Sequence, residues 1–417
     1  AGTFLAEKAL GMVMDTVLDG VWSRLLDAVR TKFPNSQHLL GDLQKDPKDG
    51  KHKAALIDSL SKQISADEGF RQQVEEMVAE LLRGGWKLPA LPPPTALHQL
   101  PADIPDFTGR EQEMTGILKE VDKEHTSSII MVVTGLGGTG KSALAVHAAH
   151  VLKERFPSTQ LYVDLRGADA QPASPLDVLA SFLRALGGGE TDIPKDLNEL
   201  EVKYRSVLAN RRALVLLDNA RDETQVRSLI PGGAGCLVLI TSRWSLGALE
   251  SAGLRLELST LLKEDSLALL ARCGGQERVS GEPDAAERIV RLCGYLPLAV
   301  RIAGGHLRTR AATLWEYADS LEDENGRLAA LQAGDKAVRA SFMLSYQSLS
   351  PWEARLFRLI GLLRGKSFSP KAALALDGGE EKHVWNVLEH LVDAQLIGVN
   401  GTRYSIHDLV HLLAGEC

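Results

Sequence analysis

The chain has 417 residues and a formal net charge of −7, with 44% hydrophobic and 24% charged residues. This composition belongs to a folded globular protein with room for about two to four domains, and the acidic balance argues against a general positive field for nucleic acid or anionic lipid. The four cysteines lack the spacing of a zinc site or a disulfide framework, and no apolar run reaches the roughly 20 residues that cross a bilayer, so we expect a cytoplasmic protein.

Residues 1–86 predict an N-terminal helical bundle. Apolar residues recur at helical spacing over residues 5–33, and two further helices are expected near 52–64 and 67–83. The broad apolar surface of the first helix also suits a helix that lies on a membrane, so a membrane-permeabilising role stays open beside a bundle core. The proline-rich stretch 87–106 predicts a stiff, extended linker.

Strands and helices alternate between residues 107 and 260. Continuous apolar strands in such an alternation predict a parallel sheet that helices cover on both faces. The expected strands are 129–134, 160–164, 213–218, 237–241 and 255–258. Residues 261–335 then predict a purely helical domain, and residues 336–417 predict several helices with a hairpin that pairs 396–399 with 404–406.

A phosphate-binding loop lies between the first of these strands and the helix that follows it. The octapeptide Gly135-Leu136-Gly137-Gly138-Thr139-Gly140-Lys141-Ser142 fits the pattern G-x-x-x-x-G-K-[ST] at every fixed position. Its glycines let backbone N–H groups point at phosphates, Lys141 neutralises β/γ oxygens, and Ser142 ligates Mg²⁺. The predicted nucleotide contacts here are Gly135, Gly137, Gly138, Thr139, Gly140, Lys141, Ser142 and Ala143.

Two later strand ends supply the other candidate residues of the nucleotide site. Asp218 ends an apolar strand, where a phosphate-loop protein places its Mg²⁺-directing carboxylate, although an aspartate is also common at turns. Asn219 follows it and cannot take a proton from water, so we expect a slow ATPase at most. Arg243 ends the next strand and can sense a γ-phosphate, unless it is a solvated surface residue. Lys141, Asp218 and Arg243 are thus the candidate catalytic residues, and Ser142 and Asp218 the candidate magnesium ligands.

Six motifs in this order resemble the NB-ARC domain of STAND-class P-loop signalling ATPases, found in bacterial regulators, plant immune receptors and apoptotic adaptors. They are Phe107-Thr108-Gly109-Arg110-Glu111, the phosphate loop, Leu216-Leu217-Asp218-Asn219, Thr241-Ser242-Arg243, Gly294-Tyr295-Leu296-Pro297-Leu298 and Ile406-His407-Asp408-Leu409. The resemblance covers about residues 100–415. It implies an α/β nucleotide-binding domain at 107–260, a helical domain at 261–335 and a winged-helix domain at 336–417.

The resemblance also implies roles for individual residues. Phe107, Gly109 and Arg110 would line an adenine pocket, and Pro297 would pack on the base or ribose. His407 would contact the β-phosphate of ADP and latch the winged-helix domain over it. The alternatives are that Pro297 is only the first residue of a helix and that His407 is a turn residue with local partners.

The sequence departs from the family pattern in three of these motifs. Tyr295 is inserted before Leu296-Pro297-Leu298, Ile406 replaces a methionine, and Asn219 stands in place of a second acid. The first change crowds a turn, whereas the second conserves side-chain volume.

The function implied is a nucleotide-gated switch, closed with ADP and open with ATP. Opened chains would self-associate and present the N-terminal helices to a downstream protein, in defence or regulatory signalling. Direct DNA binding through the winged helix is an alternative, although the best reading helix, residues 381–393, is mixed to acidic. A metabolic kinase is a further alternative, but the sequence shows no base for an acceptor. We also expect a truncated chain, because sensor repeats usually follow this domain in the family.

Overall fold

The computed structural model describes residues 97–417, apart from 170, 190–192, 250, 310–311, 334–335 and 364. The predicted helical module at 1–86 and the first part of the predicted linker, 87–96, lie outside the described residues. The described chain belongs to one compact unit. Among its helices, none combines the length and the apolar character that crossing a membrane requires.

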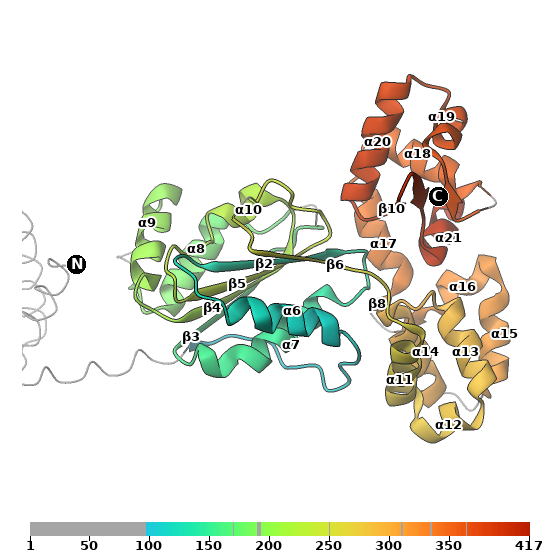
Figure 1. Ribbon diagram of the computed structural model, residues 1–417, viewed down its shortest axis with the longest axis horizontal. Helices are drawn as coiled ribbons and strands as arrows, with labels where there is room; N and C mark the ends of the chain where they lie inside the picture. The colour runs from blue at the N-terminus through green and yellow to red at the C-terminus, as the bar shows by residue number, and fades with distance from the viewer. Residues whose placement is uncertain are drawn as a thin grey trace, which may run out of the picture. The chain divides into compact units, whose positions relative to one another are not determined.

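A parallel sheet of six described strands forms the first half of this unit, in the order β1-β3-β4-β5-β2-β6 (Figure 1). Its central strands β2, β4 and β5 are buried along almost their whole length, as their continuous apolar runs predicted. Because the strands are parallel, their carboxyl ends meet along one edge of the sheet. The strands are Leu97–His98 (β1), Ile129–Gly135 (β2), Thr159–Asp164 (β3), Ala213–Ala220 (β4), Cys236–Ser242 (β5) and Leu254–Leu258 (β6).

Helices cover both faces of this sheet (Figure 1). Helices α6 and α7 pack on one face against residues such as Val133 and Leu239, and α8, α9 and α10 pack on the other face against the neighbouring Val132 and Val238. Successive side chains of a strand point to opposite faces, which accounts for the two separate cores. The helices are Glu111–Val121 (α6), Lys141–Leu152 (α7), Pro175–Ala185 (α8), Leu197–Leu208 (α9) and Glu223–Arg227 (α10).

The remaining chain forms two segments in which helices predominate. The first, here called the helical segment, comprises α11 to α16 and ends in the short antiparallel strands β7 and β8. The helices agree with the pattern predicted after residue 261, whereas β7 departs from the purely helical domain predicted for 261–335. The elements are Lys263–Gly274 (α11), Gln276–Gly281 (α12), Pro283–Leu292 (α13), Pro297–Thr309 (α14), Leu314–Glu322 (α15), Glu324–Ala330 (α16), Gln332–Ala333 (β7) and Lys336–Ala337 (β8).

The second, the C-terminal segment, comprises α17 to α21 and a small antiparallel sheet in the order β10-β11-β9. Here the predicted hairpin is displaced by about two residues: Asn400 pairs with Arg403, and the turn is Gly401-Thr402. Leu396 and Ile397 are buried in the core instead of forming the first strand. The elements are Val338–Gln347 (α17), Pro351–Gly361 (α18), Ser367–Phe368 (β9), Pro370–Asp377 (α19), Glu381–Asp393 (α20), Gly398–Asn400 (β10), Arg403–Ser405 (β11) and Asp408–Glu416 (α21).

One hydrophobic core runs through both segments, from Leu261 to Ala414. Phe342 of α17 and Phe357 of α18 are among its fully buried side chains. Because the two segments share this core, the burial of apolar surface stabilises them together.

Phe357→Ala should lower the free energy of unfolding by about 3–5 kcal/mol, because it removes a buried ring and leaves a cavity. Trp352→Ala on the same helix is the matched control, since Trp352 is 59% exposed and Phe357 is 0% exposed. The control should cost at most about 1 kcal/mol. Urea unfolding of both variants measures the difference, and equal losses would contradict the placement of α18.

Candidate nucleotide-binding site

The predicted phosphate loop connects β2 to α7 at the carboxyl edge of the sheet. Its backbone has positive φ angles at Gly135 (139°), Gly138 (87°) and Gly140 (93°), which favour glycine. A Cβ atom at Gly135 would also lie 2.5 Å from the backbone oxygen of Leu258 in β6. The glycine pattern therefore lets the loop curl and lie directly against the neighbouring strand.

Lys141 begins α7 with its side chain buried under this loop. Its Nζ donates hydrogen bonds to the backbone oxygens of Gly135 (2.8 Å) and Leu136 (3.0 Å). Burial lowers the pKa of the ammonium to about 7; the charge of Arg243 lowers it as well, and that of Asp218 opposes both. The loop thus encloses a cation whose charged form an additional anion would stabilise.

Asp218 and Ser142 lie together, as expected of two ligands of one metal ion. The Ser142 hydroxyl donates to Asp218 Oδ1 at 2.7 Å, and the Thr241 hydroxyl donates to the same oxygen. Thr241 accepts a bond from the backbone N–H of Asn219 at 2.8 Å. A carboxylate and a hydroxyl held side by side form an all-oxygen donor set, which fits Mg²⁺.

These residues line a cavity of about 350 Å³, here called the phosphate cavity. Its walls come from the sheet edge, from the helical segment and from the C-terminal segment. The loop and α7 contribute Gly138, Gly140, Lys141, Ser142 and Ala143; the strand ends contribute Asp164, Asp218, Asn219, Thr241 and Arg243; α14 contributes Pro297, Leu298 and Arg301; and α17 contributes Ser341.

Direct contacts join the loop to both segments around this cavity. The backbone N–H of Leu298 donates to the Gly138 oxygen at 3.2 Å. Arg243 donates through Nη1 to the Ser341 oxygen at 2.5 Å, and burial lowers the pKa of this guanidinium. A Cβ atom at Gly137 would lie 2.7 Å from Ser341 Oγ, so α17 approaches the loop where only glycine leaves space.

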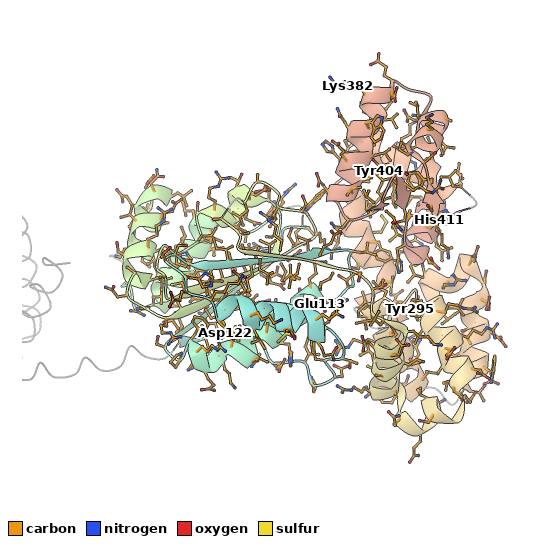
Figure 2. All side chains as sticks on the ribbon, in the orientation of Figure 1. Glu113, Asp122, Tyr295, Lys382, Tyr404 and His411 are labelled. Atoms are coloured by element: carbon orange, nitrogen blue, oxygen red, sulfur yellow. The ribbon has the colours of Figure 1, made fainter. Side chains whose placement is uncertain are left out.

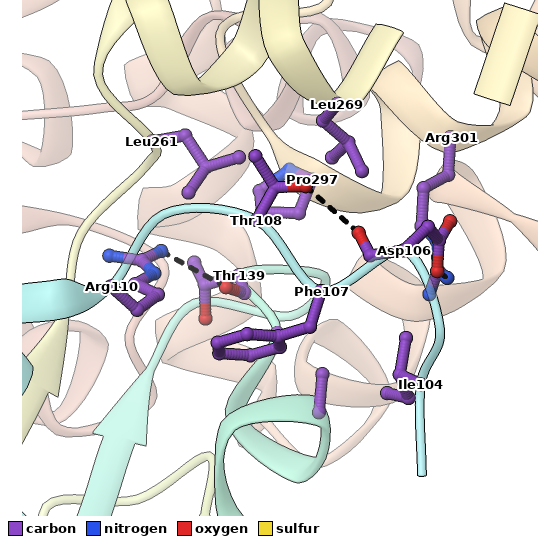
Figure 3. A pocket seen from close by; sticks show the side chains of 12 residues that line it. Ile104, Asp106, Phe107, Thr108, Arg110, Thr139, Leu261, Leu269, Pro297 and Arg301 are labelled. Carbon is purple, nitrogen blue, oxygen red and sulfur yellow. Dashed lines mark hydrogen bonds and ion pairs between the residues drawn. The ribbon is translucent and has the colours of Figure 1, made fainter. Parts of the chain in front are cut away.

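A second cavity, here called the base cavity, adjoins the first (Figure 3). Leu261, Leu269 and Pro297 lie across it from Phe107, so its walls are largely apolar. Arg110 and Thr139 also line this cavity. The buried Arg110 guanidinium donates to the oxygen of Thr139 at 3.1 Å, and this bond holds the two residues together. An apolar slot with a few polar groups suits a purine base.

A ring contact and an ion pair hold two of the residues that line the base cavity, Phe107 and Arg301. The Phe107 ring stacks on His147 with centroids 4.1 Å apart. Arg301 of α14 forms a two-point ion pair with Asp106, with one bond, from Nε to Oδ2, of 3.0 Å. Arg301 lines both cavities, so this pair ties the helical segment to the strip of chain before α6.

The structure brings most of the predicted site residues to these two cavities. Phe107, Arg110, Thr139, Gly140, Ala143 and Pro297 line the base cavity, and Gly138, Gly140, Lys141, Ser142, Ala143, Asp218, Arg243 and Pro297 line the phosphate cavity. Gly109, Gly135, Gly137 and His407 are not among the lining residues of either cavity. Pro297 is also the first residue of α14, which confirms the helix-start alternative, and its contact with a base or ribose stays a prediction.

His407 lies at the first turn of α21, where both of its ring nitrogens have partners. Nε2 donates to the Gly294 oxygen at 2.9 Å, and Nδ1 accepts from the backbone N–H of Leu409 at 3.2 Å. Burial lowers the pKa of this histidine. Its contact with a β-phosphate therefore stays a prediction, while the observed bond links α21 to the turn that leads into Pro297.

Sequence reasoning missed three residues of the phosphate cavity: Asp164, Arg301 and Ser341. Asp164 ends β3 as Asp218 ends β4, and the two are paired in register. The same strand-end signal that identified Asp218 was therefore available for Asp164. Arg301 and Ser341 lie within helices, where no local pattern distinguishes them from other surface positions.

Comparisons with known proteins identify the family of this part of the chain. Residues 110–280 match the protein family described as the NB-ARC domain. The regulatory protein AfsR of Streptomyces coelicolor is 47% identical over 327 residues, which cover 76% of this chain and 33% of AfsR. The putative disease resistance protein RGA1 of Solanum bulbocastanum is 27% identical over 340 residues, which cover 74% of this chain and 34% of RGA1. The chain thus spans about a third of the length of these curated relatives.

Among solved structures, one similar chain is a signal transduction ATPase with numerous domains (STAND) from Pyrococcus horikoshii, which has a tetratricopeptide repeat sensor. It is 18% identical, with a TM-score of 0.36, and the match covers 79% of this chain and 44% of that protein.

Binding of ADP should take up close to one proton at pH 8. The free loop holds the Lys141 pKa at about 7, so at pH 8 most of this lysine is neutral, and bound phosphates restore its charge. Affinity should then fall by up to about tenfold for each pH unit above 7. Calorimetry in buffers of different ionisation enthalpy measures the uptake.

Lys141→Arg provides the control for this titration, because an arginine stays charged throughout and should bind ADP without proton uptake. No uptake by the unmodified chain at pH 8 would contradict a lysine that is neutral in the free site.

Proposed function

The chain belongs to the NB-ARC family of the STAND class through residues 110–280, and on that premise we propose that it is a nucleotide-dependent switch. The observation that carries this proposal is the composition of the phosphate cavity, whose walls come from the sheet edge, α14 and α17. A nucleotide in that cavity touches all three parts of the described chain. Its phosphates can therefore determine how the parts pack on one another.

We propose that the three parts are the domains expected from the sequence: nucleotide-binding at 107–260, helical at 261–335 and winged-helix at 336–417. The C-terminal segment also contains the small β10-β11-β9 sheet, whose strands lie between its helices. This combination of helices and a small sheet supports the winged-helix assignment. The Gly109–Arg110 region and Pro297 would hold adenine, and the loop glycines with Lys141 would hold the phosphates. Ser142 and Asp218 would hold Mg²⁺, which neutralises phosphate charge when bound.

Arg243 is the residue through which a γ-phosphate would act. In the structure its guanidinium donates to the backbone oxygen of Ser341 in α17. A charged phosphate oxygen is a stronger acceptor for arginine than a neutral carbonyl. With ATP, Arg243 would turn to the γ-phosphate and release α17, whereas with ADP it would keep that contact. The two nucleotides would then differ in affinity for the two arrangements, as a switch requires.

His407 would also support the ADP-bound arrangement, through α21 of the C-terminal segment instead of α17. Its bond to the Gly294 oxygen connects α21 to the turn before Pro297. Loss of the Arg243–Ser341 contact or of the His407–Gly294 contact would loosen the C-terminal segment. Opened chains would then associate with one another. We propose that this event presents the N-terminal helices to a downstream protein in the cytoplasm, in regulatory or defence signalling.

The surface of α20 gives no support to a DNA-binding role. Its exposed side chains include the carboxylates of Glu381, Glu389 and Asp393, with Lys382 at its exposed end (Figure 2). A reading helix needs arginine or lysine for phosphates and base edges.

Purified protein should release about one adenine nucleotide per chain on denaturation, and Lys141→Ala should release none. The variant removes the charge that meets the β- and γ-phosphates, and it should melt at a lower temperature than the loaded protein because bound ligand stabilises the folded state. Chromatography of the released nucleotide and a thermal melt measure both effects. Identical melting of stripped and loaded protein would refute the proposal.

His407→Ala should speed ADP release by roughly tenfold, because it removes one buried hydrogen bond from the closed arrangement. His411→Ala is the matched control. Its Nε2 also bonds a backbone oxygen, that of Leu363, but within the C-terminal segment. Figure 2 labels His411. Release of a fluorescent ADP analogue measures the rates. Equal rates for the two variants would show that His407 does not hold the segments together.

A further inference from the structure

We infer that Asp164 is the general base of ATP hydrolysis in this chain. The inference rests on the proposed function, because it assigns a catalytic residue to the same nucleotide site. Asp164 ends β3, and its partner in the register of the sheet is Asp218 at the end of β4. Adjacent strands lie about 4.8 Å apart, so the two carboxylates lie at neighbouring positions on one edge of the cavity.

The other polar groups of the phosphate cavity do not provide a base. Among the described residues that line it, the carboxylates are those of Asp164 and Asp218. Asp218 accepts bonds from the hydroxyls of Ser142 and Thr241, which direct it toward the metal position. Asn219, at the position after Asp218, has an amide that cannot accept a proton from water. This leaves Asp164 for proton abstraction.

The backbone around Asp164 is fixed by the strand beside it. After β3 ends, the Leu165 N–H donates to the Asp218 oxygen at 2.8 Å, and the Gly167 N–H donates to the Asn219 oxygen at 2.7 Å. A Cβ atom at Gly167 would lie 2.5 Å from that Asn219 oxygen. The two backbone segments therefore lie too close together for any residue larger than glycine. Asp164 is thus held beside Asp218 by backbone contacts on its C-terminal side.

The carboxylate itself is oriented with one oxygen bound and one available. Oδ1 accepts the Arg166 backbone N–H at 2.9 Å and the Asn219 side-chain amide at 3.4 Å. Among the described residues, no donor bonds to Oδ2. Asn219 therefore takes part as a donor that orients the base, in place of the acid expected at its position. An oriented carboxylate with a free oxygen is what a general base requires.

The step is hydrolysis of the terminal phosphoryl group. The oxygen of a water molecule attacks the γ-phosphorus while a proton of that water passes to Oδ2 of Asp164. The bond between the γ-phosphorus and the bridging oxygen breaks, and ADP leaves with the electron pair of that bond. Asp164 then returns the proton to solvent or to the released phosphate.

Asp164→Asn should slow phosphate release by about 100-fold or more, with little change in ATP affinity. The asparagine keeps an acceptor for the Arg166 N–H but cannot take a proton. The assay is single-turnover release of labelled phosphate by the full chain with Mg²⁺, with affinity measured by a fluorescent ATP analogue. Asp164→Glu should recover part of the rate, because it keeps a carboxylate that can take the proton.

Asp169→Asn is the control, because Asp169 is an exposed aspartate of the same loop and should turn over at the unmodified rate. Equal turnover by Asp164→Asn and the unmodified protein would overturn the inference, as would an equal loss in Asp169→Asn. Protein that binds ATP but releases no phosphate would overturn the inference and leave the switch standing. Protein that binds no nucleotide would overturn both.

Discussion

The nucleotide site depends on one buried lysine ammonium, that of Lys141. Lys141 lies under the phosphate loop. Burial and the charge of Arg243 oppose protonation of the lysine, and the charge of Asp218 favours it. Removing a cation from water costs several kcal/mol unless partners compensate. The loop carbonyls supply part of that compensation. Bound phosphate would supply the rest, so affinity for an anion is built into the fold.

The contacts that hold the segments together use weak acceptors. Arg243 bonds the Ser341 oxygen, His407 bonds the Gly294 oxygen, and the Leu298 N–H bonds the Gly138 oxygen. Each acceptor is a neutral backbone carbonyl. The bonds from the neutral donors of His407 and Leu298 contribute roughly 1 kcal/mol each, and the charge-assisted bond from Arg243 about twice that. Bonds to charged phosphate oxygens are about twice as strong. Phosphate can therefore compete with these contacts, although it does not compete with the shared hydrophobic core behind them.

That core sets a limit on how the segments can separate. Buried residues from α11 to α21 belong to one cluster, whereas the sheet has its own two cores. The apolar surface between the helical and C-terminal segments is costly to expose. At the sheet edge, Leu136 and Trp244 pack against this core, and hydrogen bonds from Arg243 and Leu298 cross the same boundary. The sheet edge is therefore the boundary at which a nucleotide can act.

The sequence predicted the local parts of this site and missed what tertiary packing adds. The phosphate loop and the strands at 129–134, 160–164, 213–218, 237–241 and 255–258 follow from patterns within short stretches, and the structure has strands there. The short strand β1 lies instead within the predicted linker. The convergence of Arg301 and Ser341 on the loop joins positions about 160 and 200 residues away from it, and no short pattern encodes that. The hairpin shifted because Leu396 and Ile397 gain more from burial in the core than from strand pairing.

Asp164 and Asp218 end neighbouring strands of the parallel sheet, and we assign proton abstraction to the first and metal binding to the second. Asp218 is 9% exposed and engaged with two hydroxyls, whereas Asp164 is exposed at the rim. A base in contact with bulk water works in a high dielectric, where electrostatic stabilisation of a transition state is weak. Turnover at such a site should be slow. For a switch, slow turnover is useful because hydrolysis limits how long the ATP-bound arrangement can last.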